Sequence, residues 1–324
     1  MSAMSGNRGK GRKDYVPTPL NYTGSKFRLL PQILPLMDMS GITCFHDMFC
    51  GGGVMSANVL RENPGMTIRM NDLEEHLMSF YAHLATVTDI EDFIEQVTAL
   101  RDAYGLTDSQ SRGYASYGAD SSKGLGSVNK AAYTRLRKDY NDRLGAGDSG
   151  DEMQVMFYLL IVYAFNNQIR YNSKGQFNLP VGKRDLNARM LAKLRAFHGC
   201  GVLRAAELTC LDFREFGNGR EYGPDDFLYA DPPYLITLAA YNERDGWTEK
   251  DDTDLMDMLD EVSATGARFA MSNVLEHNGR RNDRLAEWAD ERGYEVHHLN
   301  FDYNNSNYHS KAKGGVTDEV LITS

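Results

Sequence analysis

The pattern that most restricts the fold of this chain is an alternation of short apolar strands with amphipathic helices. Strands are predicted at residues 42–47 and 66–71, and a helix follows each of them, at 54–60 and 74–87. The alternation resumes later, with strands predicted at 227–230, 268–272, 294–301 and 319–323 and helices at 250–262 and 283–292. Strands that alternate with helices form a mostly parallel sheet covered on both faces. The predicted fold class is therefore α/β, with a Rossmann-like sheet.

The alternation is interrupted between residues 88 and 199. A Gly/Ser-rich stretch at 105–127 is predicted to be a long loop, and helices are predicted at 130–144 and 151–165. Residues 166–182 are predicted to form a hairpin that turns at Ser173-Lys174-Gly175. We therefore expect a mainly helical domain at 88–199, carrying a β-hairpin, inserted into a sheet domain at 15–87 and 200–324. Residues 1–14, rich in Gly, Ser and Lys, are expected to be a disordered basic tail.

The charge of the chain is unevenly distributed. The net charge is −10, yet residues 1–30 carry a net charge of +5 and residues 123–195 a net charge of +7. Two basic segments on an acidic body suit a local contact with a polyanion. On charge alone, solvated helix faces that happen to be basic are an equally good interpretation.

Several classes of protein do not fit the sequence. No apolar run approaches the ~20 residues of a membrane span, and the N-terminus has no apolar leader. The four cysteines form no CxxC pair and have no histidine at metal-ligand spacing, so we expect reduced thiols and no metal site.

The first segment with chemical meaning is the Gly-rich turn at residues 45–53. It follows a predicted strand and precedes a predicted helix, so its backbone can approach a ligand closely at a helix N-terminus. Asp72 follows Gly53 by 19 residues at the end of the next strand. That spacing is typical of acidic residues that bind ribose hydroxyls. A tight turn without a ligand is the alternative.

The second segment, Asp231-Pro232-Pro233-Tyr234, is more specific. A predicted strand delivers one carboxylate, two prolines that cannot donate hydrogen bonds, and an aromatic ring. The Asp231 carboxylate and the Pro232 carbonyl can accept both hydrogens of an exocyclic amino group, and the Tyr234 ring can stack on the attached base. A strand ended by proline with a capping Asp explains the prolines but not the whole tetrapeptide.

Two further segments are weaker by themselves. Residues 19–26 contain Tyr22, Gly24 and Lys26, which could place a ring, a close backbone and a cation beside a ligand carboxylate. In the predicted hairpin, Gln168 could read adenine and Arg170 could read guanine in the major groove. An ordinary turn and a solvated hairpin are the respective alternatives.

Taken in order, these segments resemble the Dam-like (α-group) adenine-specific DNA methyltransferases. The resemblance rests on residues 21–26, Phe49-Cys-Gly-Gly-Gly53, Asn71-Asp72, Phe177-Asn-Leu-Pro-Val-Gly182, the 231–234 tetrapeptide and the closing strand at 319–323. It implies a class I methyltransferase sheet, S-adenosylmethionine as cofactor, double-stranded DNA as partner, and a target-recognition domain at 88–199. Phe165 and Gln168 differ from the Tyr and Leu expected in GATC-reading members, so the resemblance does not favour GATC over other recognition sites.

The resemblance and the residue types together give a full set of expected site residues. The expected catalytic residues are Asp231, Pro232, Pro233 and Tyr234. The expected cofactor-binding residues are Tyr22, Gly24, Lys26, Asp47, Phe49, Gly51, Gly53, Asp72, Asp212 and Asp231. The expected DNA-binding residues are Asn166, Gln168, Arg170, Asn172, Asn178, Pro180 and Lys183.

The predicted activity is methyl transfer to the N6 atom of a flipped-out adenine in duplex DNA. A methyltransferase of the same fold that acts on cytosine N4 or on RNA adenine is one alternative, and a catalytically dead DNA-binding regulator is another. The resemblance implies a cytoplasmic protein encoded by a bacterium, an archaeon or a phage. It leaves open whether a restriction endonuclease accompanies the enzyme or whether it acts as an orphan.

Overall fold

The computed structural model describes residues 15–22, 24–120, 122–218, 220–237, 246–300 and 317–324. The tail predicted at 1–14 lies outside these residues. Among the described helices, none is both long enough and apolar enough to cross a membrane.

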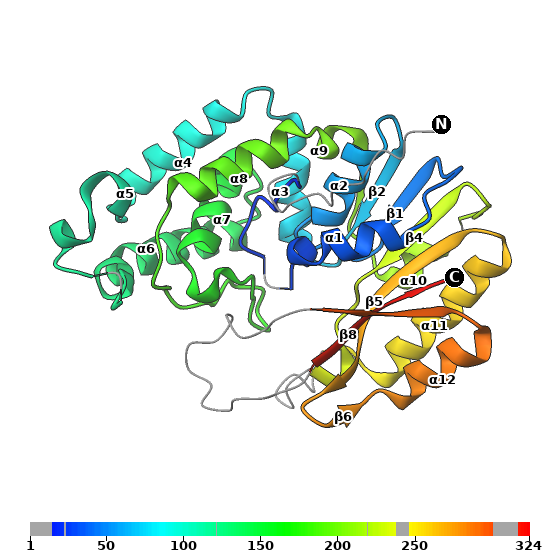
Figure 1. Ribbon diagram of the computed structural model, residues 1–324. Coiled ribbons are helices and arrows are strands. Elements are labelled where there is room, and N and C mark those ends of the chain that lie inside the picture. Colours follow the sequence, from blue (N-terminus) through cyan, green and yellow to red (C-terminus); the bar gives the residue numbers. More distant parts are fainter. Residues whose placement is uncertain (1–14, 23, 121, 219, 238–245, 301–316) are drawn as a thin grey trace, which may run out of the picture.

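One sheet organises the described part of the chain (Figure 1). Its main path has the strand order β3-β2-β1-β4-β5-β8-β7. The strands are β1 (Cys44–Asp47), β2 (Thr67–Asn71), β3 (Ala206–Thr209), β4 (Asp226–Ala230), β5 (Arg268–His277), β7 (Glu295–Leu299) and β8 (Thr317–Thr323), and β6 (Arg280–Arg281) pairs with the end of β5. Strands β3, β2, β1, β4 and β5 are parallel, whereas β8 runs antiparallel between β5 and β7. The predicted mostly parallel α/β sheet is thereby confirmed.

Two apolar cores lie on the two faces of this sheet. Side chains alternate between faces along a strand, so Phe227 and Tyr229 of β4 enter one core while Leu228 and Ala230 enter the other. The first core is covered by α1 (Leu30–Ile33), α2 (Val54–Glu62), α3 (Glu75–Thr86) and α9 (Val202–Ala205). The second is covered by α10 (Phe213–Gly217), α11 (Glu249–Ala264) and α12 (Asp283–Arg292).

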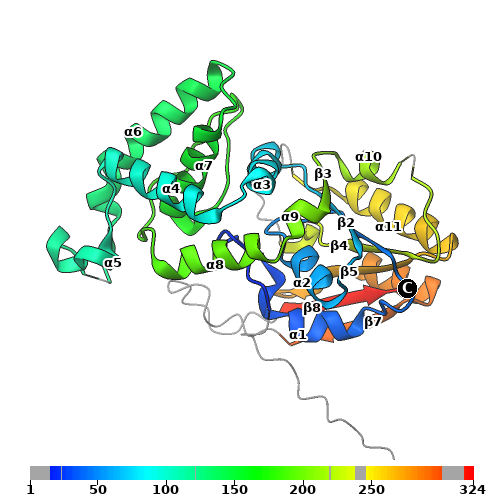
Figure 2. The ribbon, with the colours of Figure 1, turned by 90° about the horizontal axis from the view of Figure 1, so that it is seen from above.

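The segment that interrupts the strand–helix alternation is helical and lies to one side of the sheet (Figures 1 and 2). Its longer helices are α4 (Ile90–Tyr104), α6 (Gly126–Gly145), α7 (Asp151–Tyr163) and α8 (Ala188–Gly199). The helix α7 is buried along almost its whole length and packs against α3, α4 and α6. Because α3 also covers the sheet, the first core continues from the sheet into these helices.

The structure contains helices and a strand that the sequence patterns did not predict. Helices α4 and α8 and strand β3 had no predicted counterpart. The predicted loop at 105–127 contains two short helical segments, α5 (Ser109–Arg112) and η4 (Tyr114–Tyr117). The helix expected to continue to residue 165 ends at Tyr163, because Ala164 is extended with a ψ angle of 157°.

The predicted hairpin is confirmed at its turn but not as two regular strands. Isolated bridges join Ala164 to Val181 and Tyr171 to Phe177. Gly175 closes the turn with φ 70°, and its N–H donates to the Asn172 carbonyl.

Candidate active site

A cavity of about 680 Å³ opens at the carboxyl ends of β1, β2 and β4. The strands β1 and β4 are neighbours in the sheet. The strands next to β1 on one side are β2 and β3, and the strand next to β4 on the other side is β5, so the strand order reverses between β1 and β4. In open α/β sheets, ligands bind in the crevice at such a reversal. All four predicted catalytic residues line this cavity, as do Tyr22, Gly24, Lys26, Asp47, Phe49, Gly51, Asp72 and Asp212.

Gly53, although predicted as a cofactor residue, does not line the cavity. It has a φ of 67° and stands before the first residue of α2. A Cβ atom on Gly53 would come within 2.7 Å of the Phe197 ring. The absence of a side chain at Gly53 therefore allows Phe197 of α8 to pack closely against the turn.

The Gly-rich turn is fastened to the end of β2. The Gly51 N–H donates to Asp72 Oδ2 over 2.8 Å, and the Glu74 N–H donates to Asp72 Oδ1 over 2.9 Å. Gly51 has a φ of 45°, and a Cβ atom there would lie 2.9 Å from the Tyr22 ring. Burial raises the pKa of Asp72 although these hydrogen bonds oppose the shift. Asp72 thus shapes the turn and lines the cavity at the same time.

Asp47, the last residue of β1, has an unsatisfied oxygen. Its Oδ2 accepts a 2.6 Å hydrogen bond from Ser56 Oγ, while the buried Oδ1 has no partner among the described residues. Burial raises the pKa of Asp47 to about 7. An orphaned buried carboxylate oxygen in a cavity wall is suited to a hydrogen-bond donor on a ligand.

At the other side of the cavity, Asp231 is held by two residues. Lys26 Nζ lies 2.8 Å from Asp231 Oδ1, and the Tyr234 hydroxyl donates to the same oxygen over 2.8 Å. The Lys26 ammonium also lies 5.0 Å from the centre of the Tyr234 ring. Burial raises the pKa of Tyr234, so its hydroxyl keeps its proton. Both contacts are made to Oδ1 of Asp231, and neither of them involves Oδ2.

Three aromatic rings line the cavity together, as an aromatic wall, and of these only Phe49 was predicted from the sequence. The rings of Phe49, Phe213 and Trp247 lie 5.3 to 5.7 Å apart, centre to centre. Asp212 precedes this wall and pairs with Arg214 at 3.2 Å. Phe213 could have been predicted as a cavity residue, because it directly follows Asp212 in the sequence. Trp247 is distant from every motif, so nothing in its local sequence indicates a place in the cavity.

The predicted DNA-binding residues lie together on the hairpin that follows α7. Asn166, Gln168, Arg170, Pro180 and Lys183 are exposed, while Asn172 and Asn178 are half-buried. Arg170 Nε donates to Asn178 Oδ1 over 2.7 Å, so these two residues support each other across the hairpin. Phe165, at the start of the segment, is a large apolar side chain that is 48% exposed.

The helix α6, which lies in the basic segment at 123–195, has several of its cations paired within the protein. Arg143 lies 2.8 Å from Asp148 and 2.6 Å from Glu152, and Lys138 pairs with Asp142. Arg137 donates to the Leu179 carbonyl of the hairpin. Only the Arg137 contact among these reaches the hairpin, and through it α6 supports the hairpin backbone.

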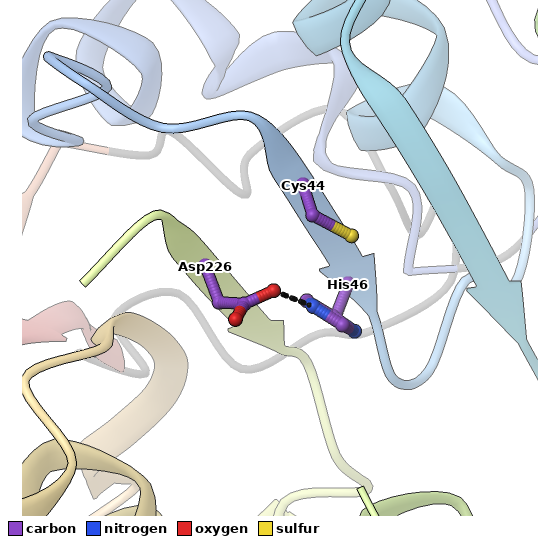
Figure 3. A group of neighbouring side chains, drawn as sticks. All are labelled: Cys44, His46 and Asp226. Carbon is purple, nitrogen blue, oxygen red and sulfur yellow. Dashed lines mark hydrogen bonds and ion pairs between the residues drawn. The ribbon is translucent and has the colours of Figure 1, made fainter. Parts of the chain in front are cut away.

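The described residues hold one group with metal-ligand chemistry, formed by Cys44, His46 and Asp226 (Figure 3). It lies at the amino-terminal ends of β1 and β4, opposite the cavity. His46 Nε2 is 2.7 Å from Asp226 Oδ1, and burial lowers the pKa of His46. The other ring nitrogen, Nδ1, is buried without a partner among the described residues, whereas a metal-bound histidine normally donates from it. We therefore assign this group to the packing of the sheet.

Comparisons with known proteins agree with the site. The family model described as D12 class N6 adenine-specific DNA methyltransferase matches residues 22–304. The chain is 31% identical over 317 residues to Modification methylase StsI of Streptococcus sanguinis and 30% identical over 319 residues to Type II methyltransferase M.FokI of Planomicrobium okeanokoites. These matches cover 96% and 95% of the chain but 43% of each relative, so the chain spans less than half the length of these two proteins. A shorter match, 31% identical over 105 residues, covers 32% of the chain and 33% of the DNA adenine methylase of Haemophilus influenzae.

Proposed function

This chain belongs to the D12 class of N6 adenine-specific DNA methyltransferases, and we propose that it transfers a methyl group from S-adenosylmethionine to the N6 atom of an adenine in double-stranded DNA. One observation carries the proposal. The Gly-rich turn, Asp72 and the 231–234 tetrapeptide, which are far apart in the sequence, converge on one cavity at the strand-order reversal. The parallel sheet with its antiparallel β8 is consistent with the class I methyltransferase fold.

The cavity suits S-adenosylmethionine in charge and in shape. The orphaned oxygen of Asp47 can accept from an amino group, and the Asp72 carboxylate can accept from ribose hydroxyls. The wall of Phe49, Phe213 and Trp247 offers apolar faces for a purine ring. When bound, the cofactor supplies a methyl group activated by a sulfonium.

The 231–234 tetrapeptide prepares the target nitrogen. In our proposal, Asp231 Oδ2 and the Pro232 carbonyl accept the two N6 hydrogens, and the Tyr234 ring stacks on the adenine. Accepting these hydrogen bonds favours an sp³-like nitrogen whose lone pair is available for attack. The adenine must leave the duplex to reach this cavity. Positioning and electrostatics then provide most of the rate enhancement, and no strong general base is required.

We propose that the helical segment at 88–199 is the target-recognition domain. The exposed polar side chains of its hairpin, including Gln168 and Arg170, are suited to base edges in the major groove. Lys183 is exposed just beyond the hairpin and is suited to phosphate contact. The names of StsI and M.FokI describe a modification methylase and a type II methyltransferase. We propose, by analogy, that this chain protects DNA from a cognate restriction endonuclease.

A methyl-transfer assay tests the proposed function. The protein is incubated with methyl-labelled S-adenosylmethionine and with duplex DNA, RNA or protein, and the labelled DNA is hydrolysed to nucleosides. We expect label in DNA alone, in N6-methyladenine. Sequencing of the methylated DNA then identifies the recognition site.

Three outcomes would contradict the proposal. Label in N4-methylcytosine would identify a cytosine-methylating enzyme, and label in RNA would identify an RNA methyltransferase. Specific DNA binding without label in any substrate would indicate a regulator with an inactive catalytic domain. Asp225→Ala, an exposed position at the opposite end of β4, is the control for substitutions in the cavity.

A further inference from the structure

The aromatic wall of the cavity is anchored to a buried carboxylate of α11. The half-buried Trp247 lines the cavity, and its indole Nε1 donates a hydrogen bond to Asp252 Oδ1. Asp252 is 7% exposed and does not itself line the cavity. Because an indole has a single N–H, the position of its acceptor restricts the orientation of the ring. The Asp252 carboxylate therefore acts on the cavity through the indole.

The backbone around Trp247 is fixed by the start of the same helix. Thr248, the next residue, is the N-cap of α11 and forms a capping box with Asp251. The Thr248 N–H donates to Asp251 Oδ2 over 2.7 Å, and the Asp252 N–H donates to the Thr248 carbonyl over 3.1 Å. The indole and its acceptor are therefore joined both through their side chains and through a hydrogen-bonded turn.

A second ring of the wall is tied to the same part of α11. The guanidinium of Arg214 lies 4.3 Å from the centre of the Phe213 ring. Arg214 also pairs with Asp251 and with Asp254, and its Nε atom lies 2.6 Å from Asp254 Oδ2. The Trp247 ring lies 5.3 Å from the Phe213 ring at an interplanar angle of 40°. Contacts to the first two turns of α11 thus hold two of the three rings.

The wall suits the purine end of the cofactor better than the amino acid end. A purine has flat faces for aromatic contact, and its amino group can donate to a carboxylate such as Asp212 or Asp251, which line the same cavity. The amino acid end has charges and no ring. Contacts between aromatic rings favour offset and edge-on arrangements, so a change in the tilt of one ring weakens them.

We propose that Asp252 is a positioning residue that sets the orientation of the Trp247 indole, and that the indole binds the adenine ring of the cofactor. The inference rests on the proposed function for the identity of the cofactor. It gives a part in cofactor binding to a carboxylate that lies outside the cavity and outside every segment that carries the family resemblance.

Binding of S-adenosylhomocysteine and of adenosine, in the absence of DNA, tests the inference. Both compounds carry the purine, and only the first carries the amino acid. Asp252→Leu removes the acceptor and keeps a branched side chain, and we expect about tenfold weaker binding of both compounds. Asp252→Asn keeps an acceptor oxygen and should bind both compounds as the wild type does. Asp257→Asn, at an exposed position of α11, is the matched control.

The fluorescence of Trp247 measures its surroundings directly. The chain has two tryptophans, and Trp288 packs against the second core, where its Nε1 donates to Asp260. Trp288→Phe therefore leaves Trp247 as the single indole. In this background, S-adenosylhomocysteine should change the emission saturably. Asp252→Leu should shift the emission of the free protein to longer wavelength, because the indole gains contact with water, and Asp252→Asn should not.

A double-variant cycle shows whether Asp252 acts through the indole. Trp247→Phe keeps an aromatic face but has no N–H, so it does not need the acceptor. We expect Asp252→Leu to weaken ligand binding much less in the Trp247→Phe background than in the wild type. Equal losses in the two backgrounds would mean that Asp252 acts on the fold and not through the indole, which would overturn the inference.

The inference is also overturned if Asp252→Leu binds both compounds as the wild type does, or if it loses S-adenosylhomocysteine but not adenosine. Trp247→Ala keeps the test decisive should Asp252→Leu fail to fold, because unchanged binding in Trp247→Ala overturns the inference by itself. Failure of the proposed function is distinct. It would appear as a wild-type protein that binds S-adenosylhomocysteine but methylates no DNA adenine.

Discussion

The cavity at the carboxyl ends of β1, β2 and β4 and the hairpin at 166–182 use the same kinds of polar side chain but hold them in opposite ways. In the cavity, Asp47 and Asp231 are fixed by partners that are themselves largely buried, such as Ser56 and Lys26. On the hairpin, the predicted base-reading side chains Gln168 and Arg170 are exposed, although Arg170 donates to Asn178, and the backbone is held from α6. Asn141 of α6 bonds both the N–H and the carbonyl of Phe177.

The contrast between buried and exposed polar side chains suits the two regions to different functions. A buried carboxylate acts on one atom of a ligand, and its loss leaves an uncompensated partner behind. An exposed side chain on a fixed backbone can be exchanged with little cost to the fold. Substitutions in the cavity should therefore affect rate or cofactor binding strongly, whereas substitutions on the hairpin should change target preference.

The largest effect is expected for Asp231→Ala. The substitution removes the carboxylate proposed to accept from N6 and leaves Lys26 and Tyr234 without their shared partner. We expect the rate of methyl transfer to fall on the order of 10²-fold or more, with DNA binding almost unchanged. Single-turnover kinetics and a gel-shift assay measure the two effects. Near-normal turnover would remove the tetrapeptide from the mechanism.

A smaller effect, confined to the cofactor, is expected for Asp72→Ala. This change removes the acceptor for the Gly51 N–H and a carboxylate of the cavity wall. We expect the KM for S-adenosylmethionine to rise by roughly tenfold or more while the KM for DNA stays the same. Glu75→Ala, three residues along and exposed, is the control. Equal changes in both KM values would contradict the assignment.

On the hairpin, Arg170→Ala and Lys183→Ala should have different effects. We expect Arg170→Ala to relax the preference at one base pair of the methylated site by about tenfold. We expect Lys183→Ala to weaken binding to all DNA alike and to lessen its dependence on salt. Deep sequencing of methylated sites and binding at several salt concentrations measure these effects. An unchanged recognition site in Arg170→Ala would point to residues 105–127 as the reader instead.

A stacked pair joins the hairpin to α3, the helix that follows Asp72. The His76 ring, near the start of α3, lies 4.2 Å from the Tyr171 ring of the hairpin, and the Tyr171 hydroxyl is 3.0 Å from that of Tyr140 in α6. We expect His76→Ala to lower the preference for the cognate site severalfold without changing cofactor affinity, because the hairpin loses a lateral support. His76→Phe keeps a ring and should retain the preference. A loss of cofactor affinity in His76→Ala would show that the pair serves the cavity.

The smallest effect concerns Asp47 and pH. Its pKa is raised to about 7 in the folded protein, so the folded state holds a proton that the unfolded chain releases above about pH 4. The resulting contribution to the free energy of unfolding is present below about pH 4 and is lost as the pH rises through about 7. We therefore expect the wild type to lose stability relative to Asp47→Asn between about pH 5 and about pH 8. Urea denaturation across this range measures the difference, and parallel stability curves would contradict the assignment.

The sequence predicted the elements whose residues carry local patterns. Strands β1, β2 and β4 were expected because apolar runs lead into a glycine turn, an acidic end and a proline pair. Strand β3 was missed because its four residues are only partly buried and have no apolar run. The cavity residues in motifs were found, whereas the place of Trp247 in the cavity and the contact of Glu319 with Lys26 depend on segments that are distant in the sequence. The hairpin was expected at the correct turn, but its regularity was overestimated because side chains of α6 replace part of the strand pairing.

The place of β8 in the sheet has a consequence for synthesis on the ribosome. The strand inserts between β5 and β7, which precede it in the chain. Until β8 has emerged, the exposed edge of β5 and the whole of β7 lack their antiparallel partner, and Lys26 lacks Glu319. Nascent chains that lack this strand can bury most of the first core but leave Lys26 without its contact to Glu319. Activity should therefore arise only once β8 has emerged and inserted, after the cavity walls have formed.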